Sequence, residues 1–155
     1  MKNKDVDSLK KAKNYAFLLL KFRTRSEKEI YQRLKKKKFN EEIIKKTISF
    51  LKDKNFIDDA CFAKAWIESR LRRPLGLRRI KEELRLKGID KEILDCQIEN
   101  VKEGYLEEDI VLKLAKTRLS KLKGIEPQKA KSRIFSFLLR RGFSPQIVID
   151  VINQL

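Results

Sequence analysis

One apolar pattern occurs three times in this chain of 155 residues. The copies begin at residues 30, 80 and 134, and each has the same spacing of apolar side chains. They are Ile30, Leu34, Phe39, Ile43, Ile44, Ile48 and Leu51; Ile80, Leu84, Ile89, Ile93, Leu94, Ile98 and Val101; and Ile134, Leu138, Phe143, Ile147, Val148, Ile152 and Leu155. Repetition at this period indicates an array of similar helical units rather than one irregular globule.

Each copy predicts two helices joined by a tight turn, because within each half the apolar residues recur with the spacing of one helical face. Asn40, Asp90 and Ser144 follow the third apolar residue of each copy, and residues of these types cap helix N-termini. A further helix is expected before each pair, at about Leu9–Arg23, Asp59–Arg72 and Glu107–Lys123. The sequence therefore predicts an all-α fold of three tandem three-helix repeats, at residues 1–55, 56–103 and 104–155.

The expected turns are visible in the residue types. Gly88 and Gly142 stand just before the third apolar residue of their copies, where a left-handed backbone favours glycine. The first copy has Lys38 there, at a cost of about 1 kcal/mol relative to glycine. Ser26 and Glu29 have the spacing of a capping box, which predicts the start of the next helix.

The chain is strongly basic, with 39 lysines and arginines against 22 acidic residues and a net charge of +17. Residues 1–55 contain 18 basic and 7 acidic side chains, residues 56–103 contain 11 and 10, and residues 104–155 contain 10 and 5. A field of this sign favours polyanions, either nucleic acid or an acidic protein surface. The first repeat is expected to be its strongest source.

An enzyme is not expected. The sequence has no histidine, the commonest general base, and no cluster of histidine and cysteine that could hold zinc. Its five glycines stand apart, so no glycine-rich loop is available for nucleotide phosphates. The adjacent acids Asp58 and Asp59 are expected to cap a helix rather than to form a catalytic pair. No cofactor is expected.

The lengths of the apolar segments and the small number of cysteines favour a protein of the reducing cytoplasm. No run approaches the length of a membrane span, and residues 1–7 lack the apolar core of a signal peptide. Cys61 and Cys96 are expected to be free thiols that are buried or half-buried. Five aromatic residues are expected to pack in the core: Phe17, Phe22, Phe62, Trp66 and Phe137.

Several groups of cations are candidate binding residues for nucleic acid or a protein filament: Lys35, Lys36, Lys37, Arg70, Arg72, Arg73, Arg78, Arg79, Arg140 and Arg141. The arginines before Pro74 are the strongest candidates, because only Glu68 is nearby in sequence to neutralise them and arginine grips phosphate or carboxylate with two hydrogen bonds. Arg78 and Arg79 have acids one turn later, so ordinary surface pairs explain them about equally well.

Three motifs follow one another along the chain. They are Ser26–Ile30 with Leu34; Asp58–Ala63 followed by Arg70, Gly76, Ile80, Leu84 and Lys87–Ile89; and Arg140–Phe143. Over about residues 10–155 they resemble the repeat signatures of the RecX family, bacterial regulators of the RecA recombinase. Ile30 and Lys38 depart from the leucine and glycine that are usual in the family.

The resemblance implies a modulator rather than a catalyst. It implies an elongated, curved array of repeats, with right-angled turns, that lies in the groove of the RecA filament on single-stranded DNA. There it would inhibit filament growth, ATP hydrolysis and recombination. We expect a monomer that acts in the cytoplasm without contacting a membrane and that binds single-stranded DNA weakly and without sequence preference.

Two other functions remain open on the sequence. The first is a sequence-independent DNA- or RNA-binding protein whose repeats act as helix-turn-helix-like units. The second helices carry mainly Lys, Arg and Glu, with Gln32 and Gln128 as exceptions, which disfavours direct reading of bases. The other open function is that of a scaffold protein, which would bind its partners without contacting nucleic acid.

Overall fold

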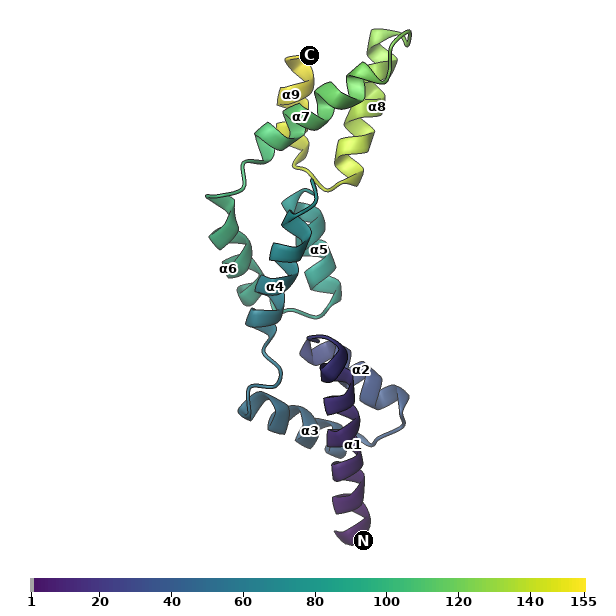
Figure 1. Cartoon of the computed structure of the whole chain (residues 1–155), viewed down its shortest axis with the longest axis vertical. Helices are drawn as coiled ribbons and strands as arrows, with labels where there is room; N and C mark the ends of the chain where they lie inside the picture. Colours follow the sequence, from purple (N-terminus) through teal and green to yellow (C-terminus); the bar gives the residue numbers. More distant parts are fainter. Residues whose placement is uncertain (1) are drawn as a thin grey trace. The chain divides into compact units, whose positions relative to one another are not determined.

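A computed structural model describes residues 2–155 as nine α-helices, with no strand in this range (Figure 1). The helices are α1 (Lys2–Phe22), α2 (Glu27–Lys36), α3 (Glu41–Asp53), α4 (Asp59–Leu71), α5 (Leu77–Leu86), α6 (Lys91–Lys102), α7 (Glu107–Ser120), α8 (Pro127–Arg140) and α9 (Pro145–Asn153). This confirms the all-α prediction.

The helices form two compact units. The first comprises the chain up to Ala65 together with Leu84–Leu94, and the second comprises Trp66–Glu83 together with Asp95–Leu155. The division passes through α4, α5 and α6, so the middle three helices contribute to both units. The repeat boundaries after residues 55 and 103 stay a prediction.

The first unit contains a core built by α1, α2 and α3, which all pack against one another. Its buried side chains are Ala12, Ala16, Leu19, Ile30, Leu34, Ile43, Ile44, Ile48, Leu51 and Ile57. In α2 and α3 these positions are the predicted apolar pattern, and the opposite faces carry the charged residues.

The second unit contains an equivalent core between α7, α8 and α9. Its buried side chains are Val111, Ala115, Ile134, Leu138, Phe143, Val148, Val151 and Ile152. Phe143 lies in the turn between α8 and α9, and its side chain is fully buried. The third copy of the apolar pattern therefore supplies most of the side chains of this core.

The turns form largely as predicted. Lys38, Gly88 and Gly142 have positive φ angles of 65°, 81° and 84°. Asn40 caps α3 by accepting a hydrogen bond from Ile43 N at 2.8 Å.

The prediction that Ser144 caps α9 was wrong, because its side chain accepts no capping hydrogen bond. Pro145 follows it at the start of the helix and has no N–H, which leaves fewer free donors for a cap to satisfy.

The helix α1 begins earlier than the apolar periodicity predicts. Residues 3–7 are exposed, and all of them except Val6 are polar, so this stretch has no apolar periodicity. Lys11 and Asp7 pair one turn apart at 2.7 Å, which supports helix formation without burial. Charge spacing, rather than hydrophobic spacing, therefore marks this segment as helical.

Three side chains expected in the interior lie outside it. Phe22 is 77% exposed at the last position of α1. Cys61 and Cys96 are free, as expected, but both are exposed. Periodicity failed at Phe22 because the helix ends there, before another turn could cover the ring.

Candidate functional site

The ten predicted binding residues fall into both units. Lys35, Lys36 and Lys37 end α2 in the first unit, and the seven arginines belong to the second. Each group is therefore a separate candidate surface.

The lysines at the end of α2 are exposed, but their surroundings differ. Lys35 Nζ lies 3.2 Å from a carboxylate oxygen of Glu41 and donates a hydrogen bond to Tyr31 Oη at 3.3 Å. These contacts raise the pKa of Lys35. Lys37 Nζ lies 5.3 Å from the centre of the Tyr15 ring. Lys36 has no salt bridge within residues 3–155, so it is the most available of the three.

Arg70 is paired, and the prediction that only Glu68 could neutralise it was wrong. Its Nε donates to Glu83 Oε2 at 2.7 Å, and its side chain is only 29% exposed. The guanidinium also lies 4.6 Å from the centre of the Trp66 ring. The pairing was missed because Glu83 is distant in sequence and reaches Arg70 only when α4 packs beside α5.

Glu83 is the centre of this cluster. Its carboxylate accepts from Trp66 Nε1 at 3.0 Å and from Arg79 Nε at 3.3 Å, in addition to Arg70. Burial raises the pKa of Glu83, but the hydrogen bonds from Trp66 and Arg70 outweigh it, so the pKa lies below its ordinary value. One carboxylate thus holds two of the predicted binding arginines.

Arg141 also has a structural role. Its Nη1 donates to Pro74 O at 3.1 Å, and its guanidinium lies 4.9 Å from the centre of the Phe137 ring. Its backbone carbonyl accepts from Gly76 N at 2.9 Å. This contact joins the α4–α5 turn to the α8–α9 turn, and a Cβ at Gly76 would clash with the backbone of Gly142. No local sequence pattern predicts the contact between Arg141 and Pro74, because the two residues are 67 positions apart.

Four of the predicted arginines remain available. Arg72, Arg73, Arg78 and Arg140 are exposed, and none forms a salt bridge in the part of the chain that the structure describes. The first two lie in the turn after α4, and Arg78 lies in the first turn of α5. They are the strongest candidates in the second unit for contact with an anionic partner.

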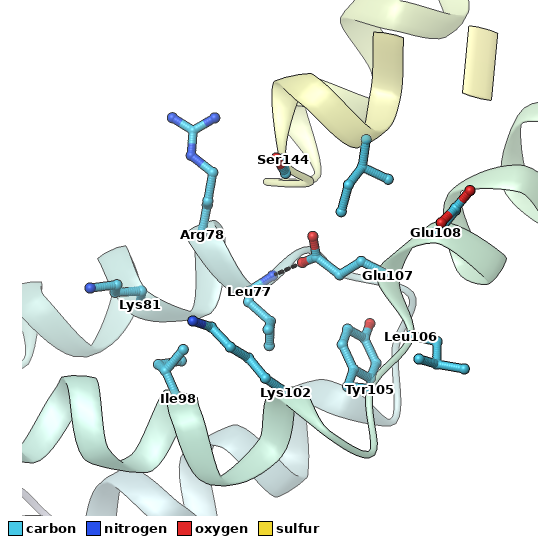
Figure 2. Close-up of a pocket in the computed structure, with 11 residues that line it drawn as sticks. Leu77, Arg78, Lys81, Ile98, Lys102, Tyr105, Leu106, Glu107, Glu108 and Ser144 are labelled. Carbon is cyan, nitrogen blue, oxygen red and sulfur yellow. Dashed lines mark hydrogen bonds between the residues drawn. The ribbon is translucent and has the colours of Figure 1, made fainter. Parts of the chain in front are cut away.

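A groove of about 520 Å³ lies beside Arg78 (Figure 2). Its lining includes the apolar side chains of Leu77, Ile98 and Leu106. Arg78, Lys81 and Lys102 stand on the α5 and α6 side, and Glu107 and Glu108 stand on the α7 side. Lys81 pairs with Asp95, and Lys102 pairs with Glu99 at 2.8 Å, so Arg78 is the one cation of this lining without a salt bridge in the described residues. Apolar surface beside Arg78 can receive an apolar side chain that neighbours an acidic group.

Two hydrogen bonds line one side of the groove, one from the α6–α7 connector and one at the first residue of α7. Tyr105 Oη donates to Leu75 O at 2.7 Å, and Glu107 accepts from Leu77 N at the start of α5 (Figure 2). Burial and the charge of Glu107 raise the pKa of Tyr105. The connector is therefore fixed to the α5 end of the same unit.

The acidic pair Asp58 and Asp59 caps helices, as predicted, but two different ones. Asp58 accepts from Ala60 N and Cys61 N at the start of α4. Asp59 accepts from Glu27 N at the start of α2, at 2.9 Å. Within the described residues, no group of three or more Cys, Asp or Glu could hold a metal ion. In the same range, no helix combines the length and apolar character needed to cross a membrane.

Comparison with known proteins identifies the family. Residues 12–51, 58–96 and 107–152 match the first, second and third three-helix domains of RecX. The chain belongs to the RecX family. The Regulatory protein RecX of Clostridium beijerinckii is 32% identical over 97% of this chain and 71% of its own length. The Regulatory protein RecX of Amycolatopsis mediterranei is 34% identical over 94% and 83%.

A solved structure agrees with this assignment. The crystal structure of RecX from Lactobacillus salivarius has a TM-score of 0.85 and 25% identity, with 97% of each chain covered. The RecX fold is therefore shown independently of the sequence matches. Of the seven predicted arginines, five lie in the matched second domain (Arg70, Arg72, Arg73, Arg78 and Arg79), and Arg140 and Arg141 lie in the third.

Proposed function

We propose that this RecX family chain binds the RecA filament on single-stranded DNA and inhibits its growth, ATP hydrolysis and recombination activities. Family membership across all three domains is the observation that carries the proposal, since the relatives are named regulatory proteins. In this role the chain acts by binding, as a monomer, without a cofactor or catalysis.

The second unit supplies a surface suited to this role. Arg72, Arg73 and Arg78 are exposed, and the groove beside Arg78 adds apolar surface. Phosphates need only the cations, whereas a protein surface also uses the apolar floor. The combination supports a protein partner in addition to DNA.

The direct test is DNA-dependent ATP hydrolysis by RecA filaments, with and without this protein. Substoichiometric amounts should slow hydrolysis, because a molecule that contacts neighbouring subunits affects more than one active site. A control reaction should add an unrelated protein of similar net charge at the same concentration. Equal hydrolysis rates at physiological salt would contradict the proposal.

The alternative is a sequence-independent DNA- or RNA-binding protein that has no effect on RecA. It predicts binding to single strands of any sequence. The slope of log affinity against log salt concentration should be about −0.7 for each phosphate contact. Such binding together with unchanged RecA hydrolysis would favour this alternative. Binding that does not respond to salt would favour a scaffold.

A further inference from the structure

A basic hollow of about 340 Å³ lies in the first unit, where the α1–α2 turn meets the outer face of α2. It is lined by Arg23, Arg25, Glu29, Gln32, Arg33 and Lys36. The last four are spaced as one helical stripe of α2, opposite the buried side chains of that helix. The volume lies at the lower end of the range of about 300–1,000 Å³ for small-molecule sites.

The single acid in the lining of this hollow is already saturated. The two carboxylate oxygens of Glu29 accept from Arg23 at 2.9 and 3.1 Å. The same carboxylate accepts from Ser26 N at 3.2 Å and from Lys87 Nζ at 2.6 Å. Burial raises the pKa of Glu29, but the hydrogen bonds from Arg23 and Lys87 outweigh it and lower the pKa to about 2. Glu29 therefore stays ionised and bound to other cations.

Three cations of the hollow are left without a carboxylate. Arg25, Arg33 and Lys36 form no salt bridge among the side chains of residues 3–155. Arg25 is half-buried and its Nε donates to Leu19 O at 3.3 Å, which anchors the side chain and leaves the terminal N–H groups free to bind. Burial and the charges of Arg23 and Arg33 lower the pKa of Arg25, as expected where like charges crowd together.

We propose that this hollow is a phosphate-binding site in which the guanidinium groups of Arg25 and Arg33 hold the phosphate oxygens. Lys36 adds a third positive charge, and the Gln32 amide can donate a further hydrogen bond. Arginine suits this task because its planar fork matches two oxygens of one phosphate. The inference deepens the proposed function, since a single-stranded DNA backbone is the phosphate source that the function offers.

The main test measures binding of a fluorescent dT oligonucleotide by anisotropy at several salt concentrations. The double variant R25Q/R33Q should bind at least about tenfold more weakly, because charge-assisted hydrogen bonds are lost. The log–log salt slope should fall by about 0.7 for each phosphate contact removed. The matched control K10Q/K45Q also loses two exposed cations of the same unit, and it should bind almost as the parent does.

A second measurement separates the two sources of phosphate. Inorganic phosphate is titrated into the protein, and the arginine Nε–H signals are followed by NMR. Shifts at Arg25 and Arg33 together with weakened oligonucleotide binding by R25Q/R33Q assign the site to a DNA backbone. The same shifts with parent-like oligonucleotide binding assign it to free phosphate. Sulfate serves as a second oxyanion for comparison.

The single variant R33Q guards against misfolding, because Arg33 makes no side-chain contact that the fold needs among the described residues. Parent-like oligonucleotide binding by R33Q and R25Q/R33Q, with unmoved Nε–H signals, would overturn the proposed site. Inhibition of RecA by the parent protein is read separately. The site can therefore fail while the proposed function stands, and the function can fail while the site stands.

Discussion

Two half-buried glutamates, one in each unit, decide which nearby arginines are available. Glu29 in the first unit binds Arg23 and Lys87, and leaves the half-buried Arg25 without a carboxylate partner. Glu83 in the second unit binds Arg70 and leaves its neighbours in the α4–α5 turn exposed. The comparison teaches that availability of a cation depends on which carboxylate the fold brings to it, more than on the charges beside it in sequence.

The largest expected difference between the two clusters is in stability. Glu29 is 12% exposed and Glu83 is 21% exposed, and Glu29 also binds a backbone N–H. Replacing Glu29 with Gln should lower the free energy of unfolding by about 3 kcal/mol, against about 1 kcal/mol for Glu83→Gln. Urea unfolding followed by circular dichroism measures both. A loss of unfolding free energy in Glu83→Gln that equals or exceeds the loss in Glu29→Gln would contradict this prediction.

The same difference should appear in the dependence of stability on pH. The pKa of Glu29 is about 2 in the folded protein, below its ordinary value of 4.5. Its contribution is therefore complete above about pH 4.5 and is lost as the pH falls toward about 2. The parent should lose on the order of 3 kcal/mol over this interval through Glu29, and E29Q should lack that loss. Parallel acid-unfolding curves for the two proteins would show that Glu29 is not the group responsible.

A smaller effect separates Arg70 from Arg72. Arg70→Gln should cost about 1 kcal/mol, because it removes the Glu83 pair and the contact with the Trp66 ring. It should also change the emission of Trp66, the only tryptophan in the chain. Arg72→Gln is the matched control and should change neither the stability nor the emission. If the two variants behave alike, Arg70 is as free as its neighbour.

The smallest effect is expected at Lys35. Its contacts with Glu41 and Tyr31 lie on an exposed surface, where ion pairs contribute little. Lys35→Gln should leave the midpoint of urea unfolding unchanged within error. A clear shift would mean that exposed pairs in the first unit matter as much as the Glu29 cluster does.

The helical pattern was predictable from the sequence because it rests on local spacing. The apolar pattern placed the cores around Leu34 and Leu138, and the capping box at Ser26 formed as predicted. The stripe that contains Arg33 and Lys36 was also predictable from the sequence, since its residues have the spacing of one helical face. The run of adjacent lysines at 35–38 gives a stronger local signal of positive charge than this stripe does.

The pairing of cations was not predictable, because it depends on contacts between residues far apart in sequence. Arg70 meets Glu83 across two helices, and Arg141 meets Pro74 across two turns. Neither pair has a local signature, so counting nearby acids gave the wrong result for Arg70. Exposure of Arg72 and Arg73 was predictable, because both precede a proline that ends the helix.

The central claim is that the available arginines of the second unit bind the RecA filament. The decisive measurement is the concentration of protein that halves RecA's DNA-dependent ATP hydrolysis, for R72E/R73E and for the control K121E/K123E, which reverses two exposed cations at the end of α7. We predict that R72E/R73E needs at least about a hundredfold more protein, since two charge-assisted contacts are lost. The control should match the parent. Equal half-inhibitory concentrations for the two variants would contradict the claim.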